Sequence, residues 1–345
     1  MIQFFDATLR DGSHANKHQF SAEDIREYCK KIDGAGLDCV IVGHGNGLGA
    51  SSLHIGQSKI SDREMLQTAR ENLCHTKLGA YMIPGFGTIR DDLLPAMEIG
   101  VELFKIGCNC TEADTTKQHI EFVASHNIPV YGVLMMYHST STQRLVEEAL
   151  KMQSYGAHGV IIMDSAGAST PELVERTIDA LCDRLYIKVG FHAHNNLGLA
   201  VANTYIAIQH GATIVDATIR GYGAGAGNCQ LEAIVALLQK ENIHTKLDLY
   251  RLMDVSRDIV SKYPFCNMGV DDISIINGLA GTFSAFKHHA IRAGSQFGVD
   301  PRDILLEAGK RHVVAGQEDI LLQIAEELHN QAKQTVDEYY LSSLL

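Results

Sequence analysis

Residues 2–14 read IQFFDATLRDGSH, and this stretch decides how the rest of the chain is interpreted. The apolar run IQFF at 2–5 has the length and composition of a short buried β-strand. A cation, an anion and an imidazole follow it closely, at Arg10, Asp11 and His14. The function of such a strand end depends on the sheet to which the strand belongs, and the remaining sequence indicates that sheet.

Seven further apolar runs recur along the chain, with amphipathic helical patterns between them. One of these helices has Ser21 as its expected N-cap with Asp24 three residues later, and another has Pro171 in its first turn. Eight strand–helix repeats in about 240 residues predict a TIM (β/α)8 barrel. A doubly wound open sheet is the alternative, although no GxGxxG follows the first run. The seven runs are LDCVIVG (37–43), KLGAYMI (77–83), VELFKIG (101–107), IPVYGVLMM (128–136), HGVIIMD (158–164), YIKVGFHAH (186–194) and ATIVDATI (212–219).

The pattern changes after residue 262, where KYPFCNMGVDD is rich in turn-forming residues. The segments that follow are helical and have no strands between them. We therefore expect a catalytic barrel over residues 1–262 and a small helical C-terminal domain over residues 263–345.

Composition excludes several classes of protein. The formal net charge of -12 and the absence of a basic run argue against binding to nucleic acid. No apolar stretch reaches the ~18 residues of a membrane span, and the first residues do not resemble a secretory signal. None of the eight cysteines forms a CxxC motif, which favours reduced thiols in the core. We expect a cytoplasmic protein.

The seventh run ends in FHAHNN, residues 191–196. Side chains alternate along a strand, so His192 and His194 face the same way. In a closed barrel only the eighth strand separates this run from the first, so Asp11 should lie near both imidazoles. Two nitrogens and a carboxylate suit a divalent metal and leave positions open for substrate oxygens. A hydrogen-bonded pair of core histidines is the less favoured interpretation.

Other polar residues also lie near these strand ends. Arg10 and Asp11 are adjacent, so we expect their side chains not to face each other. His14 is either a functional group or an ordinary loop histidine. The Gly-rich stretch GYGAGAGNCQLE (221–232) opens a helix and either presents backbone N–H groups to an anion or packs closely at the barrel mouth. Its Asn228 is placed to reach the metal or the substrate.

Several motifs together resemble a known family. They are similar to the pyruvate-aldolase branch of the metal-dependent TIM-barrel lyases that includes 3-hydroxy-3-methylglutaryl-CoA lyase, and within it to the 4-hydroxy-2-oxovalerate aldolase family. The resemblance covers essentially the whole chain, and the GQED segment separates this family from the general superfamily. The motifs are DATLRDGSHANKHQF (6–20), IPGFGT (83–88), CTEADTTKQHIEF (110–122), FHAHNNLGLAVAN (191–203), RGYGAGAGNCQLE (220–232) and SQFGVDPRDILLEAGKRHVVAGQEDI (295–320).

The resemblance implies a reaction and a set of roles. The reaction is metal-dependent cleavage of 4-hydroxy-2-oxovalerate, or a related 4-hydroxy-2-oxo acid, to pyruvate and an aldehyde such as acetaldehyde. Arg10 would steady the pyruvate enolate, His14 would be the general base, and Asn228 would lie near the metal. The metal is usually Mn²⁺, with Co²⁺ or Mg²⁺ as alternatives. The implied metal ligands are Asp11, His192 and His194.

The resemblance also implies a partner. The C-terminal helices would contact an acylating acetaldehyde dehydrogenase in a heterotetramer, and the aldehyde would pass to that partner through an internal channel. Such pairs act in the catabolism of aromatic hydrocarbons.

The sequence departs from the family on the side of the site that would hold the aldehyde. Phe283 stands where a Tyr is usual, Tyr137 stands where a Ser is more common, and Met82 and Ile83 stand near positions usually held by Leu. We expect Phe283, Tyr137 and Met82 to contact the substrate. One hypothesis is that Tyr137 fills, or supplies a hydroxyl to, the space that Phe283 leaves without one, and neutral drift is the other. The aldehyde would then differ from acetaldehyde.

Three other functions are weighed against this one. A Schiff-base aldolase needs a desolvated lysine inside the barrel, for which Lys105 and then Lys188 are the candidates. A Claisen-type condensation on an acyl-CoA needs a basic cluster that the sequence does not display. A non-catalytic docking subunit for the dehydrogenase would not need the five polar residues of the strand ends.

Overall fold

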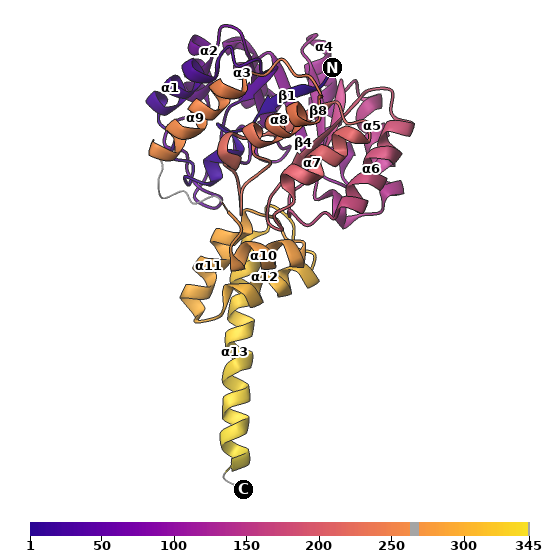
Figure 1. Ribbon diagram of the computed structural model, residues 1–345. Helices are drawn as coiled ribbons and strands as arrows, with labels where there is room; N and C mark the ends of the chain where they lie inside the picture. Colours follow the sequence, from indigo (N-terminus) through magenta and orange to yellow (C-terminus); the bar gives the residue numbers. More distant parts are fainter. Residues whose placement is uncertain (263–268, 344–345) are drawn as a thin grey trace.

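The computed structural model describes residues 1–262 and 269–343 of the chain. Eight parallel strands lie side by side in chain order, and the last pairs with the first, so the sheet closes into a barrel (Figure 1). The predicted TIM barrel is therefore confirmed. The strands are β1 (Gln3–Asp6), β2 (Cys39–Ile41), β3 (Lys77–Met82), β4 (Leu103–Asn109), β5 (Val130–Met135), β6 (Gly159–Asp164), β7 (Lys188–Ala193) and β8 (Ile214–Ala217).

Helices connect successive strands and cover the outside of the barrel (Figure 1). Among the described residues, none of the helices is both long and apolar enough to cross a bilayer. The helices are α1 (Ala22–Ile32), α2 (Asp62–Asn72), α3 (Leu94–Ile99), α4 (Lys117–Ser125), α5 (Thr142–Ser154), α6 (Pro171–Arg184), α7 (Ala200–Gln209), α8 (Leu231–Lys240) and α9 (Leu249–Lys262), with short turns η1 (Asp11–His14), η2 (Ile89–Leu93), η3 (Ala113–Thr116), η4 (Tyr137–Ser139) and η5 (Ile219–Gly221).

Local sequence signals set several helix ends. Ser21 caps α1 by accepting the backbone N–H of Asp24 at 3.2 Å, and the Asp24 carboxylate accepts the Ser21 N–H in return. Pro171 begins α6, and Gly100, with φ of 99°, ends α3. The seven cysteines of the described residues are free and five of them are buried, as predicted, whereas Cys266 lies outside the described residues.

The alternation of side chains along each strand divides the core of the barrel into two layers. In β6, Ile161 and Met163 point into the barrel and join the inner cluster. Val160 and Ile162 point outward and pack in the layer between the sheet and the helices. A residue's place along a strand therefore decides whether its side chain reaches the interior, where a site can form, or the helix layer.

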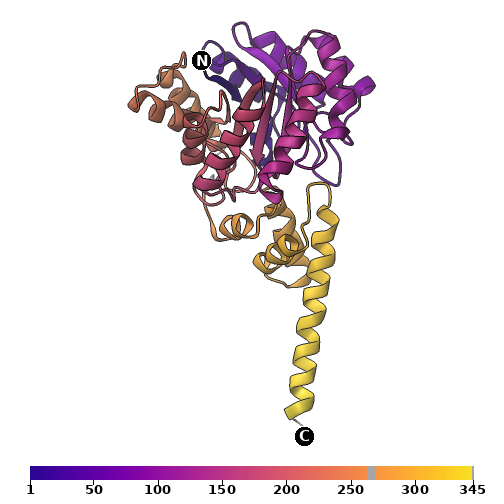
Figure 2. The same ribbon diagram turned by 90° about the vertical axis from the view of Figure 1, so that its right-hand side faces the viewer.

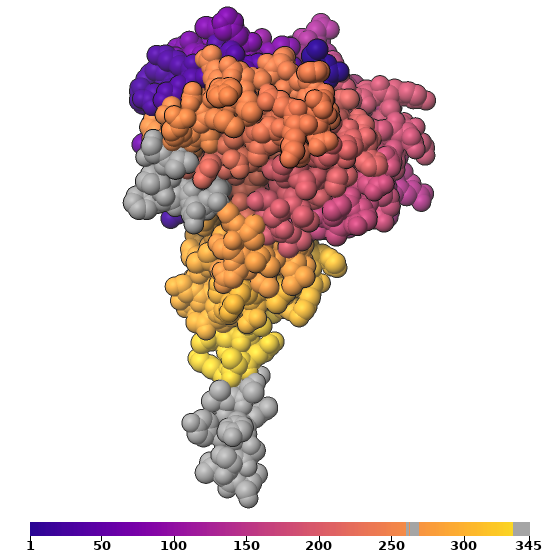
Figure 3. Space-filling model, viewed as in Figure 1, coloured from indigo at the N-terminus to yellow at the C-terminus, as the bar shows by residue number. Residues whose placement is uncertain are grey.

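Four helices form a second unit at the end of the barrel to which the strand carboxyl ends point (Figures 1 and 3). They have a hydrophobic core of their own, which also takes in Met136 and Ala166 from the barrel loops. The long last helix runs away from the barrel (Figure 2). The four helices are α10 (Asp272–Ala280), α11 (Phe286–Phe297), α12 (Pro301–Lys310) and α13 (Glu318–Ser343).

Hydrogen bonds attach this unit to the barrel mouth. The backbone N–H of Ser284 donates to the oxygen of Ser165 at 2.8 Å, and the Asn196 amide donates to the Ser284 hydroxyl at 2.9 Å. His138 contacts the oxygen of Gly281 at 3.2 Å. The helical unit therefore lies over the loops that follow β5, β6 and β7.

Candidate metal centre and active site

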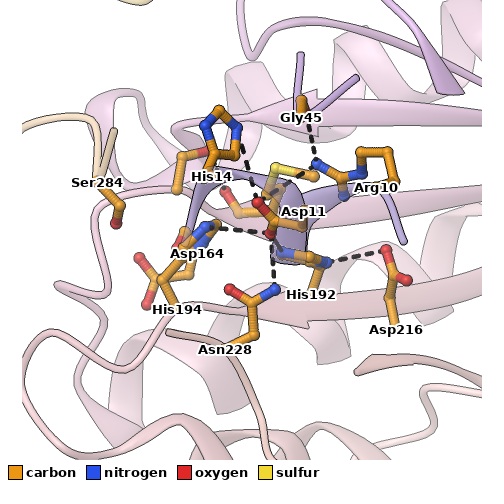
Figure 4. Close-up of polar contacts among 12 residues, drawn as sticks. Arg10, Asp11, His14, Gly45, Asp164, His192, His194, Asp216, Asn228 and Ser284 are labelled. Atoms are coloured by element: carbon orange, nitrogen blue, oxygen red, sulfur yellow. Dashed lines mark hydrogen bonds and ion pairs between the residues drawn. The ribbon is translucent and has the colours of Figure 1, made fainter. Parts of the chain in front are cut away.

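The segment that follows β1 folds tightly back over the barrel mouth. The backbone oxygen of Ala7 accepts N–H groups from Arg10, Asp11 and Gly12 at 3.0, 2.8 and 3.3 Å. The chain then enters η1, a single 3-10 turn. This turn holds the Asp11 carboxylate in the interior, where only 1% of the residue is exposed, and directs it toward β7 (Figure 4).

His192 and His194 bring two imidazoles to the same carboxylate. The Nε2 atoms of the two rings lie 3.0 and 3.4 Å from Oδ2 of Asp11. One ligand atom from each of the three residues lies within 4.8 Å of the other two. The structure thus brings together the three side chains that the sequence predicted as metal ligands (Figure 4).

A second contact orients each imidazole. Nδ1 of His192 lies 2.9 Å from Oδ2 of Asp216, and Nδ1 of His194 lies 3.0 Å from the backbone oxygen of Asp164. Both partners only accept hydrogen bonds, so each Nδ1 carries a hydrogen and each Nε2 is left to face Asp11. Metal-bound histidines in proteins are held in this way. The donor set and its orientation therefore fit a divalent cation.

Charge at this centre is finely balanced. Burial by itself would raise the pKa of Asp11, but Arg10 and His194 hold it well below its usual range. Burial would lower the pKa of His192, yet the neighbouring carboxylates of Asp216 and Asp11 raise it. A proton on His192 can thus offset the negative charge of the Asp11 and Asp216 carboxylates. A bound cation would supply that positive charge in place of the proton.

Arg10 lies beside Asp11, contrary to the expectation that adjacent side chains would not face each other. Its Nη1 is 3.6 Å from Oδ1 of Asp11, because the tight turn after β1 is not an extended strand. The same Nη1 donates to the oxygen of Gly45 at 3.2 Å, and the guanidinium lies over the ring of Tyr81. Within residues 1–262 and 269–343, Nε and Nη2 of Arg10 have no hydrogen-bond partner, so two buried donors are left for a ligand.

His14 lies at the edge of the centre, with Nε2 3.9 Å from Oδ1 of Asp11. A Cβ on Gly45 would come within 2.5 Å of that nitrogen, so the glycine makes room for the ring. The ring edge packs on His18, which in turn stacks on His44 with 3.8 Å between ring centroids. Burial lowers the pKa of His14 to about 3, so the ring is neutral at physiological pH.

Asn228 reaches the centre from the Gly-rich loop, which leads into α8 as predicted. Its amide nitrogen donates to Oδ2 of Asp11 at 2.7 Å, and its backbone N–H donates to the oxygen of Gly221 at 2.9 Å. A Cβ on Gly223 would overlap the Asn228 side chain, so this glycine allows a close approach. The amide oxygen of Asn228 has no partner in the described part of the chain and is free to meet a ligand.

The predicted aldehyde side of the site needs correction. Met82 and Tyr137 both pack in the helix layer outside the barrel, where Tyr137 meets Phe191. Phe283 belongs to the core of the helical unit, so Tyr137 does not share its space. Ile83, one residue after Met82, packs against the inner cluster instead. Ile83 and Phe283 line one cavity of about 320 Å³ at the ends of β3, β4 and β5.

The two candidate Schiff-base lysines have other partners. Lys188 is exposed at the start of β7 and donates to the Gln3 side chain at 2.7 Å, at the far end of the barrel from the metal centre. Lys105 is inside the barrel, but its ammonium is paired with the Asp216 carboxylate. Asp216 was not predicted as a site residue, and its signal is a lone acid in the apolar run ATIVDATI.

Comparison with known proteins gives a consistent result. Residues 1–259 match the HMGL-like family, and residues 268–330 match the DmpG-like communication domain. The chain is 46% identical over 337 residues to a 4-hydroxy-2-oxovalerate aldolase of Pectobacterium atrosepticum, covering 97% of this chain and 98% of that protein. It is 47% identical over 323 residues to a 4-hydroxy-2-oxovalerate aldolase of Spirochaeta aurantia, covering 94% and 95% of the two chains.

Solved structures share the fold. The carboxyl transferase domain of Rhizobium etli pyruvate carboxylase aligns with a TM-score of 0.81 at 16% identity, over 96% of this chain and 60% of that one. At that identity the likeness concerns the fold alone. Sequence identity over nearly the full length, together with both matching domains, shows that this chain belongs to the 4-hydroxy-2-oxovalerate aldolase family of lyases.

Proposed function

We propose that this protein cleaves 4-hydroxy-2-oxovalerate, or a related 4-hydroxy-2-oxo acid, to pyruvate and an aldehyde in a reaction that depends on a divalent metal. Acetaldehyde is the aldehyde when the substrate has five carbons. The observation that carries the proposal is the convergence of Asp11, His192 and His194, with Arg10 and His14 beside them.

Asp11, His192 and His194 would hold the metal. Mn²⁺ is our first candidate, as the family resemblance implies, with Co²⁺ or Mg²⁺ as alternatives. The two imidazoles and one carboxylate suit a divalent metal. When bound there, the cation would supply positive charge beside the oxygen that becomes negative during cleavage.

The protein's own groups would carry the remaining chemistry. Neutral His14 accepts the proton of the C4 hydroxyl, the C3–C4 bond breaks, and its electron pair moves toward the C2 oxygen. The free donors of Arg10 face that oxygen and stabilise its charge. C4 and its oxygen leave as the aldehyde, and a proton added at C3 gives pyruvate. Asn228 holds Asp11 in place and offers its amide oxygen to the substrate.

A cavity beside His14 brings two cations near the centre. It has a volume of about 690 Å³ and reaches from His14 to the helical unit. Lys17 and Arg292 line it, together with His288 and His289 of α11, the carboxylate of Glu318 and several apolar side chains. Such a surface suits a carboxylate that approaches the centre.

The apolar cavity on the other side suits the aldehyde portion. Ile83, Met135 and Phe283 line it, and Phe283 comes from the helical unit. We propose that this cavity accepts the C4 substituent and that its size admits aldehydes longer than acetaldehyde.

We further propose that the two parts of the chain have different functions. Residues 1–262 would form the catalytic barrel, and residues 263–345 would contact an acylating acetaldehyde dehydrogenase that receives the aldehyde. The match of residues 268–330 to a communication domain supports this partner. The free cysteines of the described residues agree with a reducing compartment, and we propose a cytoplasmic location.

The test measures pyruvate release from 4-hydroxy-2-oxovalerate with Mn²⁺ and then with excess chelator. We expect release with metal and none with chelator. His14→Ala should slow turnover by ~10²–10⁴-fold and keep the metal. His192→Ala should lose both the metal and the activity. His126→Ala, at an exposed histidine, should keep both. Pyruvate release that the chelator does not affect would refute the metal-dependent reaction.

A further inference from the structure

A buried ion pair crosses the barrel interior behind the metal centre. Lys105 comes from β4 and Asp216 from β8, on opposite sides of the eight-stranded barrel. Both side chains are 0% exposed. Removing two charges from water is costly, and a buried pair of this kind often stabilises a fold no better than apolar residues would. The pair therefore calls for a functional explanation.

The carboxylate of this pair also contacts a predicted metal ligand. Oδ2 of Asp216 accepts from the Lys105 ammonium and lies 2.9 Å from Nδ1 of His192. His194, by contrast, relies on the uncharged backbone oxygen of Asp164. At Nδ1, therefore, His192 has a charged partner and His194 has an uncharged one. A carboxylate behind a ligating histidine fixes the ring and increases its basicity.

Neighbouring side chains restrict where the lysine can go. Two cations lie near the ring of Tyr81, with Arg10 Cζ at 4.7 Å and Lys105 Nζ at 5.9 Å from its centroid. The Tyr81 hydroxyl in turn contacts the sulfur of Met135 at 3.2 Å. The ammonium is therefore enclosed by a carboxylate and an aromatic ring, and it has little freedom to leave Asp216.

These contacts form a closed circuit around the centre. The circuit runs from Asp11 to Arg10, across Tyr81 to Lys105, through Asp216 to His192, and back to Asp11. Figure 4 shows the contacts of Asp11 and the contact between His192 and Asp216. Displacing one member changes the support of its neighbours, as expected for a buried polar network.

We propose that Lys105 and Asp216 are positioning residues that set the affinity of the centre for its divalent cation. Asp216 holds the ring of His192 with Nε2 toward the cation, and Lys105 holds Asp216. This inference rests on the metal-dependent function proposed above. Lys105 would then support metal binding through Asp216 and would not act as a nucleophile.

The experiment measures the dissociation constant of Mn²⁺ by isothermal titration calorimetry on the full chain. Asp216→Asn keeps the shape but leaves an unpaired ammonium near the cation. We expect its affinity to fall by ~10–100-fold, the range seen when such supporting partners are changed. Glu148→Gln is the matched control, because Glu148 is equally buried but pairs with Lys151 at 2.9 Å on α5. Its affinity should stay at the wild-type value.

A double variant distinguishes the loss of His192 positioning from general disruption of the fold. Lys105→Met with Asp216→Asn removes both charges, so it should fold readily and should bind Mn²⁺ more tightly than Asp216→Asn alone, yet more weakly than the wild type. The electron paramagnetic resonance spectrum of bound Mn²⁺ should change in both variants and not in Glu148→Gln. Wild-type affinity in the double variant would overturn the inference. Failure of the wild-type protein to bind any of Mn²⁺, Co²⁺ and Mg²⁺ would instead refute the proposed metal-dependent function.

Discussion

Three buried histidines should make the fold sensitive to mild acid. His14, His18 and His44 pack ring against ring, and burial lowers their pKa values to about 3, 2 and 4. In the unfolded chain a histidine has a pKa of about 6.5. Between these values the unfolded chain binds protons that the folded protein does not. Stability is therefore lost as the pH falls through 6.5.

The size of the effect follows from these values. A histidine that stays neutral when folded destabilises the protein by about 1.3 kcal/mol as the pH drops from 7.0 to 5.5, or about 4 kcal/mol for three. That is a large part of an ordinary folding free energy of about 5–15 kcal/mol. The raised pKa of His192 has the opposite sign, and other histidines titrate in the same range. The pH-dependent loss of unfolding free energy is therefore compared between the wild type and a variant.

His44→Gln provides that difference. His44 accepts the backbone N–H of Asn46 at 3.0 Å and donates to the oxygen of Gly56 at 3.0 Å, and a glutamine amide can do both. Urea unfolding is measured at pH 7.0 and 5.5, with chelator present to remove metal effects. The free energy of unfolding should fall between these pH values by about 1.3 kcal/mol less in the variant than in the wild type. His126→Gln, at an exposed site, is the control. Equal losses in His44→Gln and the wild type would refute the reasoning.

Four further outcomes are expected. Borohydride with pyruvate should add no mass at Lys105, because its ammonium is paired with Asp216, and a trapped adduct would contradict that. Mn²⁺ binding should release protons, since the carboxylates of Asp216 and Asp11 raise the pKa of His192 and favour its protonated form before the metal binds, and calorimetry in two buffers that shows no release would argue otherwise. Tyr137→Phe should change kcat/KM by less than ~2-fold, because its hydroxyl lies in the helix layer, whereas Phe283→Ala should favour longer aldehydes in a substrate series.

The metal ligands that follow or end the first and seventh strands were predictable from the sequence. Alternation along the seventh run put His192 and His194 on one face, and barrel closure put Asp11 beside them. Both arguments depend on regular geometry that the apolar pattern itself reveals. The family resemblance then agreed with what the strands had already indicated.

Prediction failed where the chain leaves regular structure. Met136, directly after β5, has a φ of 55°, so alternation no longer applies and Tyr137 turns to the helix layer. Arg10 faces Asp11 because three N–H groups converge on the oxygen of Ala7. Such turns are set by tertiary packing, and the local sequence does not reveal their outcome.

A different signal was available for the barrel interior. The run VELFKIG contains one isolated cation, ATIVDATI one isolated anion, and FHAHNN an imidazole at the strand end. A charged residue within an apolar barrel strand must find a partner when it points inward, because a buried unpaired charge is too costly. Lys105, Asp216 and His192 do find each other, although 111 residues separate the first two. Isolated polar residues in the strand runs of a TIM barrel therefore predict an interior network, and here that network leads to the metal centre.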